Sequence, residues 1–257
     1  MRNVVALSIG QFSLIYLLLL VVLAIMKKSK IEQSRLLFWA SVKMSIQLML
    51  TGFVLEYIFG SPKPIYVLIY VLAMLSFATH RTFVTVPGLK REFKLAVFVG
   101  IAVSSLLVLA FFVLGVVGES VLNPQYTIPL AGMLIGNSMT GVGLGLRSFM
   151  QNIEKEKLKI NTLVNLGVAP KEVLRPFANN ALETAILPTL NSMVSMGIVS
   201  LPGMMTGQIL SGTSPNNAIM YQIAIMIAIC ASVCLCVFIS VNWGYKSLYN
   251  SKQQFEF

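Results

Sequence analysis

Polar side chains that could bind or conduct a solute occur within otherwise apolar stretches of the chain. Lys43, Gln47 and Thr51 recur every four residues, so on a helix they form a polar stripe along one face. Polar and charged groups inside a membrane are costly and usually face a bundle interior or a water path. Lys43 lies about two turns from one end of its apolar run, so its ammonium could instead reach the membrane surface. The stripe is therefore either part of a translocation path or interface, or a packed face with a snorkelling lysine.

Further candidate path residues are small polar side chains in later apolar runs: Asn137, Ser138, Asn191 and Ser192. Asn137 and Ser138 lie between the pairs Gly132/Gly136 and Gly141/Gly145, whose spacing lets helices approach closely. These residues either line a substrate path or only support tight helix packing.

The stretch Ser200–Gly212, SLPGMMTGQILSG, is too apolar for an ordinary loop and too broken for an ordinary membrane helix. One interpretation is an apolar turn packed against neighbouring helices. The alternative is a gate, in which Pro202, Gly203 and Gly207 supply the bends and the exit is lined by Met204, Met205 and Gln208. Methionine thioethers suit soft metal ions but are also ordinary apolar filler.

The remaining reactive side chains argue against an enzyme. The chain has nine glutamates, no aspartate and one histidine, and it contains no G-x-x-x-x-G-K-[ST] loop. We expect no catalytic residue and no cofactor in this chain, and ATP, if used, to be bound by another chain. Cys230, Cys234 and Cys236 lie in one apolar run, where they either pack as small residues or form a soft-metal site. Glu56 and Glu119 either attract cations or are solvated loop ends.

The elements that position these residues must be membrane helices. Hydrophobic residues make up 56% of the chain and charged residues 11%, and the mean hydropathy is +0.82. Soluble domains carry about 25% charged residues, so most of this chain is solvated by lipid or by protein. The net charge of +10 fits the Lys and Arg excess of cytoplasmic loops, and no aromatic-interleaved basic patch indicates nucleic-acid binding.

We predict an all-α, polytopic membrane protein with about seven transmembrane helices in one permease domain, residues 1–257. A bilayer core about 30 Å thick needs about 20 apolar residues of helix. The runs that meet or approach this length are Val4–Met26, Leu36–Phe59, Ile65–Thr79, Phe93–Gly118, Tyr126–Leu146, Thr184–Leu201 and Asn216–Trp243. Basic residues concentrate on one side if the N-terminus is outside and the C-terminus cytoplasmic, because only Arg2 and Lys63 then fall outside.

The sizeable soluble piece is then the cytoplasmic connection, residues 147–183. Its first part carries a charged helical pattern, Gly167 ends that helix, and Pro170 suits the first turn of the next. Pro176 is expected to bend or stop that second helix. The pattern predicts a short helix lying across the membrane surface.

Several blocks together closely resemble one family over nearly the whole chain. They are NSMTGVGLGLRSF, LGVAPKEVLRP, QLMLTGFVLEYIF and ALETAILPTLNSMVSMGIVSLPGMMTGQILSG. The chain resembles the iron-export permease family, the FetB-like membrane subunits of ABC transporters. The resemblance implies a homodimer in the cell membrane, docked on two separate ATP-binding subunits that hold ATP and Mg²⁺. It also implies export of iron or a related metal species, while some relatives are linked to aluminium tolerance and one to nucleotide-sugar export.

The cytoplasmic connection resembles the coupling loop of ABC permeases, whose pattern is Glu-Ala-Ala, then Gly, then Ile-x-Leu-Pro. Gly167 matches the glycine, while Asn161-Thr162-Leu163 departs from the acidic first block. The resemblance implies a coupling helix built on Gly167 and Pro170, with polar contacts to the ATPase from Lys171, Glu172 and Arg175.

The leading hypothesis is therefore the permease subunit of an ATP-driven exporter for iron or a related metal. An ABC permease for an organic solute such as a nucleotide sugar, and a stand-alone channel or ion-coupled carrier, remain as alternatives.

Overall fold

The computed structural model describes residues 8–249, and within them the fold is all-helical, as predicted. The predicted start of the first span before Ser8, together with Arg2 and the residues from Asn250 on, lies outside the described residues. The described elements, in chain order, are α1 (Ile9–Lys28), α2 (Ser34–Gly60), α3 (Pro64–Thr85), α4 (Arg91–Phe111), the π-helix η1 (Phe112–Val117), α5 (Pro124–Lys155), α6 (Lys157–Asn165), α7 (Pro170–Ser195), α8 (Gly203–Leu210), α9 (Pro215–Gly244) and the 3₁₀ turn η2 (Tyr245–Leu248).

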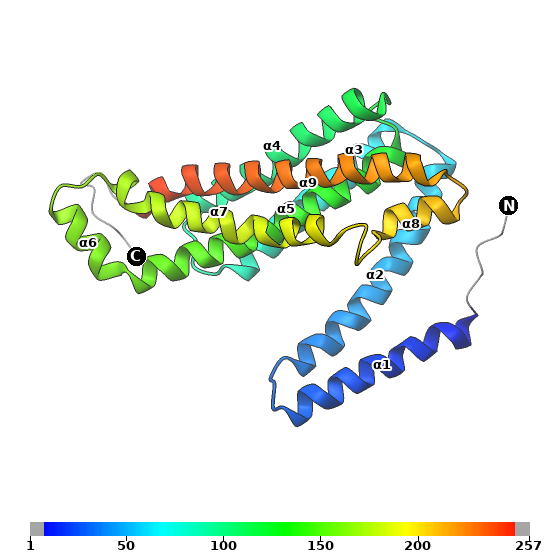
Figure 1. The fold of residues 1–257 in the computed structure, drawn as a ribbon, viewed down its shortest axis with the longest axis horizontal. Coiled ribbons are helices and arrows are strands. Elements are labelled where there is room, and N and C mark those ends of the chain that lie inside the picture. Colours follow the sequence, from blue (N-terminus) through cyan, green and yellow to red (C-terminus); the bar gives the residue numbers. More distant parts are fainter. Residues whose placement is uncertain (1–7, 250–257) are drawn as a thin grey trace. The chain divides into compact units, whose positions relative to one another are not determined.

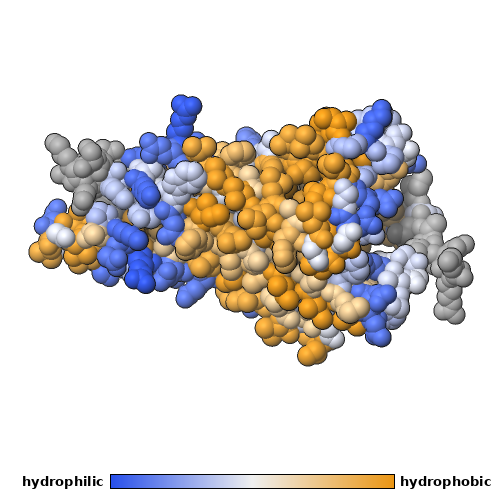
Figure 2. Space-filling model, turned by 90° about the horizontal axis from the view of Figure 1, so that it is seen from above, coloured by the Kyte–Doolittle hydropathy of each residue, from blue (hydrophilic) through white to orange (hydrophobic). Residues whose placement is uncertain are grey.

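Six helical segments of the described chain are long and apolar enough to cross a bilayer: α1, α2, α3, α4 with η1, α5, and α9 with η2. In Figure 2 hydrophobic residues gather between groups of hydrophilic residues at the helix ends. The predicted span Thr184–Leu201 falls mainly in α7, which is not among these six.

The chain divides into two compact units, which are described separately. The first holds described residues 8–62 and 210–212, the second 63–209 and 213–249. In the first unit, Ser8 caps α1 through a capping box, and the Tyr16 hydroxyl lies 2.6 Å from the Ser45 hydroxyl on α2. The facing sides of α1 and α2 form an apolar groove of about 610 Å³.

The second unit packs α3, α4, α5, α7 and α9 around an apolar core (Figure 1). Phe93 on α4 and Phe149 on α5 are fully buried there, with ring centroids 6.4 Å apart. Glycines on both partners make room where α9 meets α4. A Cβ on Gly244 would lie 2.6 Å from the Phe93 ring, and a Cβ on Gly100 would collide with the Ser240 hydroxyl.

Helix α5 has 32 residues, which at the α-helical rise is about 48 Å. This exceeds the hydrocarbon thickness of about 30 Å, so one end of α5 projects from the membrane. The projecting end is the polar one, because it carries Arg147, Asn152 and Lys155. It carries α6 and the start of α7 beyond the length of helix that the hydrocarbon layer covers.

Helix α7 differs from the prediction at Pro176, where the sequence allowed a stop. It runs without interruption from Pro170 to Ser195, with Pro176 and Pro188 inside it, so neither proline stops it. The expected short surface helix is therefore continuous with the expected sixth span. The buried side of α7, formed by Leu174, Ala181 and Ala185, packs against neighbouring helices, and such packing outweighs the hydrogen bonds that the prolines remove.

Candidate functional site

The connection between α6 and α7 is a tight, well-defined turn. Gly167 has φ = 88°, a left-handed conformation that favours glycine, and its N–H donates to the Val164 carbonyl at 2.9 Å. Pro170 follows as the first residue of α7 and is buried. The predictions that Gly167 ends one helix and Pro170 begins the next are confirmed.

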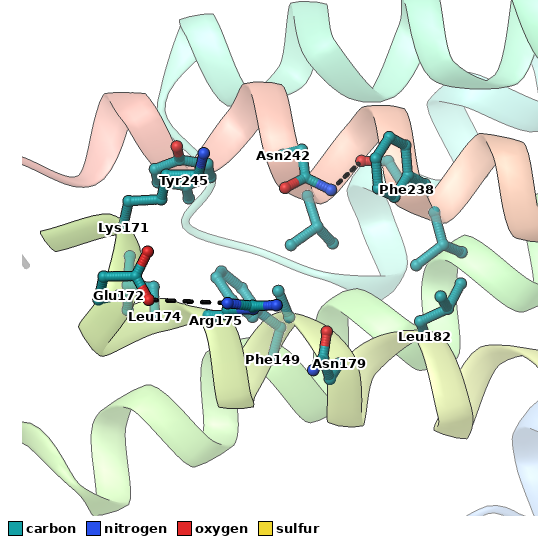
Figure 3. A pocket seen from close by; sticks show the side chains of 13 residues that line it. Phe149, Lys171, Glu172, Leu174, Arg175, Asn179, Leu182, Phe238, Asn242 and Tyr245 are labelled. Carbon is teal, nitrogen blue, oxygen red and sulfur yellow. Dashed lines mark hydrogen bonds and ion pairs between the residues drawn. The ribbon is translucent and has the colours of Figure 1, made fainter.

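The predicted docking residues of α7 border a pocket. Lys171, Glu172 and Arg175 line a cavity of about 450 Å³ whose other walls come from α5, α9 and η2. Figure 3 shows these three residues on one side of the pocket, and Asn242 of α9 and Tyr245 of η2 on the other. Glu172 and Arg175 form a 3.8 Å ion pair, and both are exposed. Such an exposed pair adds little to stability, so both side chains can exchange their partner for another protein's groups at little cost.

Two exposed leucines lie on the same connection. Leu158 on α6 is 83% exposed and Leu166 at its end is 75% exposed, whereas Ile160 between them is fully buried. Ile160 therefore anchors α6, and the leucines face away from that contact. Because this end of α5 projects beyond the hydrocarbon layer, lipid tails do not account for these leucines. Exposed apolar side chains among polar ones are typical of a protein–protein contact. Sequence analysis missed both leucines, although they stand out within the lysine- and asparagine-rich stretch.

A hydrogen-bond network ties the projecting end of α5 to α7. The Asn180 side-chain oxygen accepts bonds from the Ser148 hydroxyl and the Asn152 amide, both at 2.9 Å. Thr184 also donates to the Ser148 hydroxyl, at 3.3 Å. This network joins the projecting end of α5 to the first half of α7.

The predicted path residues Asn137 and Ser138 face different ways. Ser138 is fully buried, and its hydroxyl lies 2.8 Å from that of Ser232 on α9. Asn137 is exposed, and its amide donates to the Met133 carbonyl of its own helix at 2.8 Å. Ser138 therefore belongs to the α5–α9 contact, while Asn137 faces outward from it.

Asn191 and Ser192 on α7 are exposed as well. Gly141 packs against the Ala185 carbonyl and Gly145 against the Ala181 carbonyl, so α5 and α7 run antiparallel in close register. Because α5 and α7 are antiparallel, Asn137, one turn before Gly141, lies level with Thr189, one turn after Ala185. Asn191 follows Thr189 by about half a turn of α7. The outward sides of α5 and α7 thus share a line of polar residues, which we call the α5–α7 seam: Asn137, Ser148, Asn180, Thr184 and Asn191.

The stretch from Ser200 to Gly212 contains a helix, which corrects the predicted bends. Gly203 and Gly207 lie inside α8, while positive φ angles occur at Gly197 (84°) and Gly212 (101°). Met205 is buried, and Met204 and Gln208 are half-buried. The turns thus lie on either side of the methionines, and the methionines are held on a helix.

The other predicted residues lie on separate elements. Lys43, Gln47 and Glu56 are exposed on α2, in the first unit. Glu119 follows η1 in the second unit and accepts a bond from the Asn123 amide at 3.3 Å. Cys230 and Cys234 are half-buried on α9 and Cys236 is buried. Within residues 8–249, no three His, Cys, Asp or Glu side chains come together as metal ligands would.

The six apolar helices and the polar projecting end define a multi-pass membrane protein. The chain belongs to the uncharacterised protein family UPF0014, whose model matches residues 9–249. It is 32% identical over 249 residues to the UPF0014 membrane protein YjkA of Bacillus subtilis, covering 95% of this chain and 96% of the relative.

It is also 32% identical over 249 residues to the probable iron export permease protein FetB of Escherichia coli, covering 96% of this chain and 95% of that protein. The plant protein ALUMINUM SENSITIVE 3 of Arabidopsis thaliana is 29% identical over 214 residues, covering 83% of this chain and 77% of that protein. No solved structure matches the chain.

Proposed function

We propose that this chain is the membrane-spanning permease subunit of an ATP-driven ABC exporter for iron or a related metal species. Similarity along the whole chain to a protein named probable iron export permease supports the transport class and the substrate. The two units would form one permease domain, and two copies would assemble with two ATP-binding subunits that hold ATP and Mg²⁺. The observation that carries the ABC assignment is the α6–α7 connection, with exposed leucines beside a charged pocket at the projecting end.

We further propose that α7 is the seventh crossing, with the N-terminus outside and the C-terminus cytoplasmic. Helix α7 has 26 residues, about 39 Å, which is enough to cross the hydrocarbon core. It also runs beside α9 from end to end. Its first turns share the pocket with Asn242, near the C-terminal end of α9, and Met196 just after its other end accepts a bond from Gln222 of α9 at 3.8 Å. With the N-terminus outside, the five crossings before α6 bring the basic α6–α7 connection to the cytoplasm, and seven crossings bring the C-terminus there too, which fits the excess of Lys and Arg.

The docking step follows from this topology. A cytoplasmic ATPase would bury Leu158 and Leu166 and exchange the Glu172–Arg175 pair for its own charged groups. Movement of α7 would pass to α5 through Asn180, Ser148 and Asn152. Because α7 is continuous from the docking end to Ser195, a push on its N-terminus would be passed along the helix to the membrane-embedded half.

The α5–α7 seam is the part of the second unit best suited to line the substrate path. Its amide and hydroxyl groups would be costly against lipid tails, so a second permease copy or an aqueous path is expected to cover them. The predicted gate residues Met204, Met205 and Gln208 would lie at the outer end of this path. Lys43 and Gln47 of α2 are also proposed as path residues, because they form a polar stripe on an apolar helix.

ATP hydrolysis by the co-purified complex in lipid vesicles tests the proposal. We expect ferrous or ferric iron to raise the hydrolysis rate, and alkali cations at equal concentration to leave it unchanged. Stimulation by a nucleotide sugar and by no metal would replace the iron assignment with an organic-solute exporter. Failure of the chain to co-purify with any ATP-binding protein would remove the ABC assignment.

A further inference from the structure

A second cavity of the second unit lies between α3 and α5, away from the docking pocket. It has a volume of about 200 Å³, and its walls include Arg81 and Thr85 of α3 and Gly143 and Arg147 of α5. Gly143 is buried at this crossing, and a Cβ there would touch the Thr85 methyl group at 3.7 Å. The cavity is therefore a product of the α3–α5 packing and not of a loop.

The charge in this cavity is entirely positive. Arg81 and Arg147 are both exposed, and no acidic residue lines the cavity. One Arg147 nitrogen donates to the Thr85 carbonyl at 3.3 Å, at the C-terminal end of α3, which fixes the guanidinium at the cavity rim. Among residues 8–249, neither arginine forms an ion pair within 4.0 Å, so both guanidinium groups have donors left for an anion.

The cavity lies where the helices leave the hydrocarbon layer. Leu144 is 20 residues beyond Pro124, about 30 Å along α5, and Arg81 is 17 residues beyond Pro64, about 26 Å along α3. Apolar Met139 and Leu144 form the wall on the membrane side of the arginines. Cations above an apolar wall at this depth match the two parts of a phospholipid, its phosphate and the upper part of its acyl chains.

We propose that the α3–α5 cavity binds the phosphate headgroup of an anionic membrane phospholipid, held by Arg81 and Arg147. The apolar wall favours a lipid over a free phosphate ion, since a free ion gains nothing from Met139 and Leu144. A bound lipid would join α3 to α5, the helix that carries the docking end and the seam. The lipid would thereby hold α3 against α5, which is proposed to move with α7.

The test titrates the purified chain in neutral detergent with phosphatidylglycerol and counts bound lipids by native mass spectrometry. We expect one tightly bound phosphatidylglycerol, and no comparable binding of phosphatidylcholine. The double variant Arg81→Gln/Arg147→Gln should bind it about tenfold or more weakly, because each interfacial cation contributes to binding. The variant Lys155→Gln/Lys159→Gln removes the same charge from the same end of the protein and should bind as the unchanged chain does.

A third variant distinguishes a site that recognises the geometry of the phosphate from non-specific electrostatic attraction. Arg81→Lys/Arg147→Lys keeps the charge but loses the planar guanidinium fork. Its affinity for phosphatidylglycerol should therefore lie between that of the unchanged chain and that of Arg81→Gln/Arg147→Gln. This variant also tests the proposal if Arg81→Gln/Arg147→Gln does not fold. Equal binding of phosphatidylglycerol by Arg81→Gln/Arg147→Gln and by Lys155→Gln/Lys159→Gln would overturn the proposal. Displacement of the lipid by millimolar inorganic phosphate, or unchanged affinity in Arg81→Lys/Arg147→Lys, would overturn it as well.

Discussion

The glycines of α5 share a spacing but not an environment. Gly141 and Gly145 face backbone carbonyls of α7, at 3.3 Å and 2.8 Å from where their Cβ atoms would be, whereas Gly136 has open space around it. The spacing predicted close helix approach at both pairs, and the structure confirms it at Gly141/Gly145. At the other pair only Gly132 has a neighbour, the Met74 methyl group at 3.5 Å.

This difference gives the first prediction. Gly145→Ala should destabilise the protein by about 1–3 kcal/mol, because the new methyl group would press on the Ala181 carbonyl and force α5 and α7 apart. Gly136→Ala adds the same atom in open space and should leave stability unchanged or raise it by up to about 1 kcal/mol. Thermal unfolding in detergent measures both, and equal melting temperatures for the two variants would contradict the packing described.

Neighbouring asparagines on α7 provide a matched pair for the hydrogen-bond network. Asn180→Ala removes the acceptor shared by Ser148 and Asn152 and should cost about 1–2 kcal/mol. Asn179→Ala removes an exposed amide that borders the docking pocket and should cost less than about 0.5 kcal/mol. The same unfolding assay tests this, and a larger loss at Asn179 would show that the network is not what joins α5 to α7.

At the scale of elements, the α6–α7 connection carries the docking prediction. Leu158→Gln/Leu166→Gln should leave the melting temperature unchanged, since both side chains are exposed, but weaken ATPase binding by about tenfold or more. Thr162→Ala changes an exposed residue of the same helix and should bind normally. Co-purification of the ATPase with each variant is the measurement. Full binding by the leucine variant would place the docking surface elsewhere.

The elements also show what a single sequence can and cannot predict. The long apolar runs predicted α2, α3, α4, α5 and α9, and the local chemistry of Gly167 and Pro170 predicted the turn before α7. The helix does not stop at Pro176. The local cost of a proline is visible in sequence, whereas the packing of Leu174 and Ala181 that offsets it is not. Likewise, adjacent Asn137 and Ser138 have similar polarity, and only the position of α9 decides which one is buried.

At the scale of the whole molecule, the proposed topology predicts which residues each side of the membrane exposes. In a background with Cys230, Cys234 and Cys236 replaced by alanine, a cysteine at Glu119 should react with an impermeant thiol reagent added outside intact cells. A cysteine at Lys159 should react only after the cells are opened. Labelling of Lys159→Cys from outside would reverse the proposed orientation and with it the docking surface.

Transport through this chain is proposed to require a separate ATPase, and iron flux in inside-out vesicles measures that requirement. Vesicles containing this chain together with its ATP-binding subunit should accumulate iron when ATP and Mg²⁺ are supplied. Vesicles containing either chain alone should not. Iron movement through the isolated chain, without ATP and without the second subunit, would contradict the ABC assignment and identify a stand-alone channel or carrier.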